Sequence, residues 1–582
     1  MTCHPLKRSS SKDRKLKKLT LSALAVAEII AVGSVAAAQG LPPAKAASFG
    51  AAPTSTADTD RRPCVLSQAY VDFLLALKLA DDGSKPEALQ RLSESLRLQP
   101  RDNPAAGLAF ELLTEQRTNS SLLLRGHTAA VLYAAYNSDG NKIITTSADH
   151  TARLWDAHTG RQLTAPLQHD DAVLTADFSP DGRRVVTGSV EGAVQVWDVE
   201  TGHRIGAPME TTGAAQSVKF SADGRIIAIG SDAGRASIRN ASTGESLSPP
   251  IVYHEAVNTV NFNFDGSQIL TATGDGVADL LNSKNGSRLI KPLRQNNIIF
   301  TAVYSPDGNT VLTASADHTA KTWNAKTGEP LGPVFHHGSS IEFAAFNPDA
   351  SRVVTASMDH TARVWDAKTG NPITPPLQHG EAVLKATFSP DGTLVATASR
   401  DQTARLWDAT TGELLRLPVR TKGQVTAVTF NPSGSSFLVV SNDASVQVFD
   451  IPPHEAPPAW VADLADFAAT QIKYNQDQQP DLTRIRLLRT ELLASKSNDR
   501  WTAFGRWYFS ESAVRPISPW STVSLQQYVD SLIALGDKDS LDYAASLSHD
   551  QPAWMVKIVP LRNKLATSAS VKSTKPQTPS SD

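Results

Sequence analysis

The chain repeats itself at a constant step of 42 residues over much of its length. Residues 147–156 read SADHTARLWD, and residues 357–366 read SMDHTARVWD. The tryptophan of this segment recurs or is replaced in eight copies, namely Trp155, Trp197, Arg239, Leu281, Trp323, Trp365, Trp407 and Phe449. A turn glycine keeps the same step, except that Ala350 replaces it in the sixth copy. Because no insertion breaks the step, we expect eight equivalent structural units.

Each unit contains three short β-rich runs with turn signals between them and a fourth run after Thr-Gly. This pattern predicts one four-stranded blade per unit. The sequence resembles the WD40 family, with Gly126-His127 before the first strand and Trp155-Asp156 at the end of the third. The resemblance covers about residues 120–452. It implies a mainly β fold, an eight-bladed WD40 β-propeller flanked by small α-helical modules.

The last unit lacks a fourth strand, because Pro452 and Pro453 follow Asp450 at once. The run from Ser121 to Arg125 precedes the first full unit and is apolar enough to be that strand. We therefore predict that the ring closes by pairing its two ends, which would leave no exposed sheet edge.

The resemblance also implies a hydrogen-bonded chain of His, Ser or Thr, Asp and Trp in each intact blade. The residues that match it here are His127, Ser147, Asp149, Trp155, His337, Ser357, Asp359, Trp365, His379, Ser399, Asp401 and Trp407. A His–Ser–Asp set is also the composition of a hydrolase triad. A catalytic site has no reason to recur around a ring, so we interpret these residues as structural and expect neither an enzyme nor a cofactor.

Export is predicted from the N-terminus. Residues 1–18 hold seven basic residues and one acidic residue, and an apolar stretch follows at 19–38. A basic head, an apolar segment and small residues at 36–38 are typical of a signal peptide, and the stretch is also long enough to span a membrane. Residues 1–38 are thus a cleaved signal or an anchor, and both place the body in the periplasm or cell envelope. A linker is expected at 39–66.

Helical periodicity appears on both sides of the propeller. Residues 67–117 resemble one tetratricopeptide repeat with a following helix, in which Gly83 breaks the first helix and Pro86 opens the second. Residues 457–560 read as a helical domain rich in tryptophan, and residues 561–582 as a disordered tail. This order is similar to that of bacterial kinase–WD40 fusions, but no kinase motif is present.

Repeat arithmetic also locates a candidate partner-binding face on the loops between blades and on the turns between their second and third strands. Its residues are Asp170, Asp171, Glu381, His150, His318, His360 and Arg400. The three histidines share one repeat position, but they are spread around the ring, so we expect no metal. Near the axis, the first strands of three consecutive units carry Asp177, Lys219 and Asn261. We interpret these as the lining of a wet channel.

These patterns favour a non-catalytic protein-interaction scaffold of the bacterial cell envelope. The formal net charge of −2 predicts no nucleic-acid partner. Two cysteines, Cys3 and Cys64, are too few for a disulfide framework. The alternative is a propeller that binds or acts on a small molecule or saccharide in its central channel, and fold alone does not separate the two.

Overall fold

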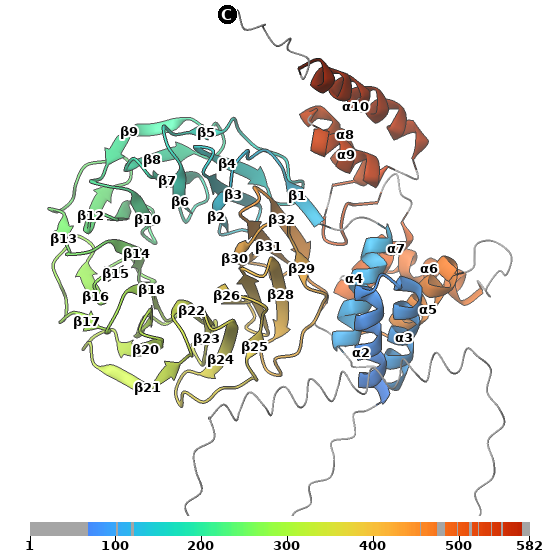
Figure 1. Ribbon diagram of the computed structural model, residues 1–582, viewed down its shortest axis with the longest axis horizontal. Helices are drawn as coiled ribbons and strands as arrows, with labels where there is room; N and C mark the ends of the chain where they lie inside the picture. The colour runs from blue at the N-terminus through green and yellow to red at the C-terminus, as the bar shows by residue number, and fades with distance from the viewer. Residues whose placement is uncertain are drawn as a thin grey trace, which may run out of the picture. The chain divides into compact units, whose positions relative to one another are not determined.

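The computed structural model describes residues 68–99, 103–117, 121–453, 456–473, 483–497, 499–510, 515–521, 523–536, 538–548 and 551–572. The predicted signal or anchor at 1–38 and the linker at 39–66 lie outside these residues. Eight four-stranded antiparallel sheets form a closed ring, and the first strand of each full repeat faces the axis (Figure 1). The predicted fold class, a mainly β eight-bladed propeller with flanking helices, is confirmed.

The first four blades follow the repeat in order. Blade 1 comprises β2 (Val131–Tyr136), β3 (Lys142–Ser147), β4 (Thr151–Asp156) and β5 (Leu167–Gln168). Blade 2 comprises β6 (Val173–Phe178), β7 (Arg184–Ser189), β8 (Ala193–Asp198) and β9 (Arg204–Glu210). Blade 3 comprises β10 (Ala215–Phe220), β11 (Ile226–Ser231), β12 (Arg235–Asn240) and β13 (Ile251–Val252). Blade 4 comprises β14 (Val257–Phe262), β15 (Gln268–Thr273), β16 (Val277–Asn282) and β17 (Leu293–Arg294).

The other four blades complete the ring. Blade 5 comprises β18 (Ile299–Tyr304), β19 (Thr310–Ser315), β20 (Thr319–Asn324) and β21 (Pro330–His336). Blade 6 comprises β22 (Ile341–Phe346), β23 (Arg352–Ser357), β24 (Thr361–Asp366) and β25 (Leu377–Gln378). Blade 7 comprises β26 (Val383–Phe388), β27 (Leu394–Ser399), β28 (Thr403–Asp408) and β29 (Val419–Arg420). Blade 8 comprises β30 (Val425–Phe430), β31 (Ser436–Ser441), β32 (Val446–Asp450) and β1 (Ser121–Leu124).

The ring closes as predicted. Strand β1 pairs antiparallel with β32, with Ser121 opposite Phe449 and Leu124 opposite Val446. Each hydrophobic core of the propeller lies between two neighbouring blades. Between blades 6 and 7, for example, Val354 and Leu377 of one blade pack against Phe388 and Trp407 of the next. Every blade is therefore supported on both faces, and the ring carries its loops on a rigid frame.

The repeated glycine is explained by backbone conformation. The turn between the first two strands of each blade places this residue in the left-handed region, with φ of 69° at Gly308 and 72° at Gly392. Glycine adopts this region without steric cost. Ala350 occupies the same position with φ of 61°, so the turn geometry holds even where a Cβ is present.

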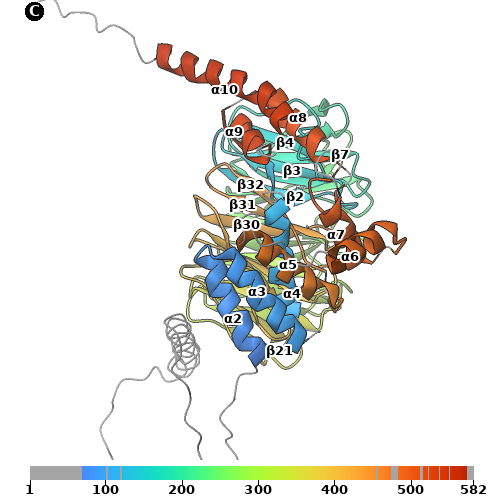
Figure 2. The same cartoon turned by 90° about the vertical axis from the view of Figure 1, so that its right-hand side faces the viewer.

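The chain forms two compact units. One unit takes in the described helices up to Ala109 and those between Glu455 and Ile485. Helices α2 (Gln68–Asp81) and α3 (Lys85–Leu98) form the predicted hairpin, with Gly83 between them and Pro86 in the first turn of α3. Helix α4 (Asn103–Arg117) follows. Helix α5 (Trp460–Lys473) packs on α3 (Figure 2), and Arg97 lies 3.5 Å from Asp463.

The position of α5 corrects the predicted boundaries, because the start of the 457–560 segment belongs with the N-terminal helices. Sequence periodicity predicted the helix but carried no information on which face it would cover. The other unit contains the propeller with α6 (Thr483–Ala494) from Arg486 on, α7 (Arg500–Phe509), α8 (Leu525–Leu535), α9 (Lys538–Leu547) and α10 (Pro552–Lys572). Helix α10 runs past 561, where we predicted a disordered tail; its leucines and alanines favour a helix.

Candidate functional site

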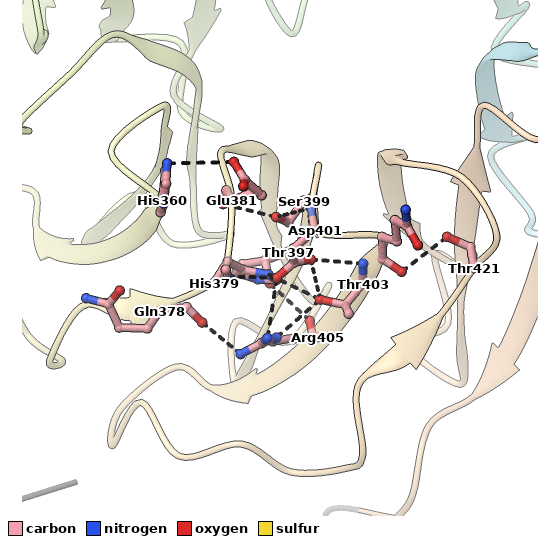
Figure 3. Close-up of polar contacts among 12 residues, drawn as sticks. His360, Gln378, His379, Glu381, Thr397, Ser399, Asp401, Thr403, Arg405 and Thr421 are labelled. Atoms are coloured by element: carbon pink, nitrogen blue, oxygen red, sulfur yellow. Dashed lines mark hydrogen bonds and ion pairs between the residues drawn. The ribbon is translucent and has the colours of Figure 1, made fainter. Parts of the chain in front are cut away.

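Blade 7 contains a buried hydrogen-bonded chain of polar side chains that joins its second and third strands, the turn between them and the loop before the first strand (Figure 3). Asp401 accepts a hydrogen bond from His379 Nδ1 at 3.0 Å, and His379 Nε2 lies 2.7 Å from Thr397 Oγ1. Trp407 Nε1 donates to the same Thr397 oxygen at 2.9 Å. A carboxylate can only accept, so Nδ1 carries the imidazole proton and Thr397 donates to Nε2. The threonine hydroxyl thus uses one donor and one acceptor site to connect the histidine with the tryptophan.

The same chain recurs in blades 1 and 6 with nearly identical geometry. In blade 1 the bonds are His127–Asp149 at 2.8 Å, His127–Thr145 at 2.7 Å and Trp155–Thr145 at 2.8 Å. In blade 6 they are His337–Asp359 at 2.9 Å, His337–Thr355 at 2.7 Å and Trp365–Thr355 at 2.8 Å. In blade 2, His169 and Trp197 share Thr187, each at 2.8 Å.

One predicted member of the chain is wrong. Ser147, Ser357 and Ser399 were expected to link the histidine with the tryptophan, but the threonine two residues earlier does so. Side chains alternate along a strand, so the serine and the threonine two residues before it both point inward. A sequence signal for the correct residue exists, because threonine recurs at the repeat step as Thr145, Thr187, Thr271, Thr313, Thr355 and Thr397.

The serines instead hold the loops between blades in place through hydrogen bonds to the backbone. Ser399 Oγ donates to the Glu381 carbonyl at 3.1 Å and accepts from Asp401 N–H at 3.1 Å (Figure 3). Asp401 also accepts from Gly380 N–H at 2.9 Å. The buried chain is therefore continuous with the loop that carries Glu381.

Burial and hydrogen bonding determine the protonation states of the histidine and the aspartate in the hydrogen-bonded chain. Burial lowers the pKa of His379, and the carboxylate of Asp401 only partly offsets this effect. Burial acts to raise the pKa of Asp149, but hydrogen bonds from Thr151, Thr128 N–H and His127 outweigh it, so that this pKa falls to about 2. Each chain therefore holds a neutral imidazole beside a carboxylate at neutral pH.

Blades 3 and 8 lack the histidine, the threonine and the tryptophan together. Blade 3 has Thr211, Ile229 and Arg239 at the histidine, threonine and tryptophan positions, and blade 8 has Thr421, Val439 and Phe449. In blade 4, the Tyr253 hydroxyl takes the place of the imidazole and lies 2.8 Å from Thr271 Oγ1. A half-satisfied buried network costs more than an apolar one, which explains why the three residues change together in blades 3 and 8. Blade 5 has Gln295 at the histidine position and keeps the bond from Trp323 Nε1 to Thr313 at 2.9 Å.

Comparison with known proteins agrees with this geometry. The family model "WD domain, G-beta repeat" matches residues 118–156, 161–198, 288–324, 328–366, 371–408 and 414–450. The ring is an eight-bladed WD40 β-propeller. The stretch that the family model leaves unmatched, between 198 and 288, holds blades 3 and 4, in which Arg239 and Leu281 replace tryptophan.

Two solved structures share the propeller fold. The computationally designed Ika8 protein has 26% sequence identity and a TM-score of 0.51, and the match covers 56% of this chain and 98% of that one. The C-terminal WD40 domain of Sif2 has 18% identity and a TM-score of 0.51, and the match covers 57% of this chain and 97% of that one. No curated protein matches the sequence.

The candidate partner-binding face lies at one end of the propeller blades. Antiparallel strands bring the loops between blades and the turns between second and third strands to the same edge. Asp171 Oδ1 lies 4.0 Å from His150 Nε2, and Glu381 Oε2 lies 4.0 Å from His360 Nε2. These four side chains are about half exposed. Two His–acid pairs thus occupy equivalent positions on the ring, and Asp170, His318 and Arg400 are exposed on the same face.

Backbone conformation accounts for the shared position of the three histidines. His150, His318 and His360 have φ of 66°, 69° and 69°. Gly192, Gly234 and Gly276 occupy the same position in blades 2 to 4 and share the left-handed conformation. Within the described residues there is no group of three or more His, Cys, Asp or Glu side chains suited to a metal ion. The position is therefore defined by the turn that it forms.

A cavity of about 80 Å³ lies between blade 8 and the C-terminal helices of the same unit. It is lined by Asp450 of β32, by Trp520 and by Tyr528 of α8, among others. Burial raises the pKa of Asp450 to about 7, although the Ser518 hydroxyl and the Arg500 and Arg416 guanidiniums oppose this rise. A raised folded-state pKa means that ionisation of Asp450 costs stability as the pH rises from about 4 to 7.

We predict that Thr145→Val lowers the free energy of unfolding by about 2–4 kcal/mol, because His127 and Trp155 each lose a buried hydrogen-bond partner. The matched control is Thr146→Val on the same strand. The Thr146 hydroxyl is buried without a hydrogen-bond partner, so its removal should be neutral or stabilising. Urea unfolding measures both, and equal losses in the two variants would contradict the assignment.

Acid should destabilise the propeller through the histidines of the chain. Their pKa values are lowered in the folded protein, so the unfolded chain binds more protons below its ordinary histidine pKa of about 6.5. Stability from these groups therefore declines as the pH falls from about 7 to 5. His379→Gln removes one of them, and Gln295 is the natural residue at this position in blade 5. The variant should lose less stability than the wild type over this range; parallel pH profiles would argue against the account.

Proposed function

We propose that this chain is a non-catalytic protein-interaction scaffold of the bacterial cell envelope, with the candidate partner-binding face as its docking surface. WD40 propellers generally mediate protein–protein interactions. The observation that carries the proposal is the rigid attachment of the loops between blades. Ser399 and Asp401 bind the backbone of the Gly380–Glu381 loop, while the side chain of Glu381 stays exposed. Variable side chains on a fixed backbone are suited to recognition.

The burial of the His–Asp pairs supports a non-catalytic role. The His379 side chain is fully buried, and its two ring nitrogens are occupied by Asp401 and Thr397. A general base must reach a proton of the substrate, which this imidazole cannot do. The repeated sets therefore serve the fold.

The charge of the face favours a basic partner segment. Asp170, Asp171 and Glu381 are exposed or half-exposed carboxylates on rigid loops, and complementary charge accelerates encounter. Asp171→Lys with Glu381→Lys should therefore reduce capture of envelope proteins on the immobilised full chain by about tenfold.

The matched control reverses two exposed charges at the other end of the blades, Glu200→Lys with Glu329→Lys. Capture by this control should equal that of the wild type in a quantitative pull-down at low salt. Retained capture by the Asp171/Glu381 variant, with an unchanged melting temperature, would move the docking surface away from this face.

The envelope location is the second part of the proposal, and it rests on the predicted export segment at 1–38. In the part of the chain that the structure describes, no helix is long and apolar enough to span a membrane. A reporter fused after residue 66 should appear outside the cytoplasm. Recovery in the soluble periplasmic fraction would indicate cleavage, and recovery with membranes would indicate an anchor at 19–38. Reporter activity confined to the cytoplasm would contradict the envelope role.

A further inference from the structure

The first strands of the blades carry two lysines on opposite sides of the ring axis. Lys219 lies on β10 of blade 3 and Lys385 on β26 of blade 7, and three blades lie between them in either direction (Figure 1). We define the axial cluster as Tyr133, Asp177, Lys219, Phe343 and Lys385. All five residues lie on innermost strands, and the partial exposure of Lys219 and Asp177 indicates that solvent reaches them.

The lysines differ in how their charge is balanced. Lys219 Nζ lies 3.0 Å from Asp177 Oδ1, and the other carboxylate oxygen accepts from Phe220 N–H at 2.9 Å. Both carboxylate oxygens of Asp177 therefore already have a partner. Lys385 forms no ion pair with any carboxylate among the described residues. The Glu342 carboxylate, next to Phe343 on β22, interacts with Arg400 instead. The axial cluster thus has one positive charge in excess.

Aromatic rings hold both ammonium groups in place. Lys219 Nζ lies 5.9 Å from the centre of the Tyr133 ring, and Lys385 Nζ lies 5.5 Å from the centre of the Phe343 ring. These distances fall within the range of cation–π contacts. The Phe343 face balances the charge of Lys385 only weakly compared with a carboxylate.

The surroundings of Lys385 disfavour its charged form. Burial and, to a smaller extent, repulsion from Lys219 together lower the pKa of Lys385 to about 8. The ammonium is still the main form at pH 7. A charged group that costs stability, next to a second cation and with no carboxylate partner, is the arrangement expected of a binding group.

We propose that Lys385 and Lys219 together bind one anionic group, a carboxylate or a phosphate, on the axis of the ring. This inference does not depend on the proposed partner-binding face. The anionic group can belong to a free small anion or to an acidic residue of a bound protein. An anion between the two ammonium groups would neutralise the excess charge and remove their mutual repulsion.

Calorimetric titration of the full chain tests the proposal, with inorganic phosphate and triglutamate as separate probes. We expect saturable binding of at least one probe with a dissociation constant of about 1 mM or tighter. Tighter binding of phosphate would indicate a free anion, and tighter binding of triglutamate would indicate an acidic segment. Absence of saturable binding for both probes would overturn the proposal.

Variants of Lys385 separate binding from folding. Lys385→Met should weaken binding by about tenfold or more and should raise the melting temperature in anion-free buffer, since it removes an unpaired cation. Lys385→Arg should retain binding. The matched control, Lys368→Met, removes an exposed lysine of a turn and should change neither property. Unchanged binding in Lys385→Met, or a lowered melting temperature that Lys385→Arg restores, would show that Lys385 has a structural role only.

Discussion

A buried threonine hydroxyl connects the histidine and the tryptophan of each intact blade, and much of the propeller depends on that connection. It ties the loop before the first strand to the second and third strands through side chains alone. The serine and aspartate of the next turn extend the tie to the backbone of the same loop. The interaction that stabilises the blade therefore also fixes the surface that a partner would meet.

The blades of the ring differ in whether they contain this threonine-centred hydrogen-bonded chain. Blades 1, 6 and 7 hold the full chain, and blade 2 keeps His169, Thr187 and Trp197. Blades 3 and 8 have lost all three members together, and blade 8 is instead completed by β1. Antiparallel pairing across the closure and apolar contact between blades stabilise these two sectors. Loss of the polar chain in some blades is thus compatible with an intact ring.

Sequence periodicity predicted the blades, their number and the closing strand, because a constant step allows only equivalent units. It also located His150, Asp171, His360 and Glu381, which the structure brings together in pairs. The threonine was missed although its repeat was visible, since sequence spacing does not show which of two inward hydroxyls reaches the indole. The packing of α5 on α3 and the approach of Lys385 to Phe343 depend on tertiary contacts that no local pattern encodes.

Exchange of the indole protons with deuterium tests the central role of the threonine-centred chain most directly. The Nε1–H groups of Trp155, Trp365 and Trp407 donate to buried threonines, so they should exchange only when the propeller unfolds. The exchange rates of these protons, measured by NMR, should therefore correspond to the global free energy of unfolding. Fast exchange of these three protons in a stably folded protein would contradict the account.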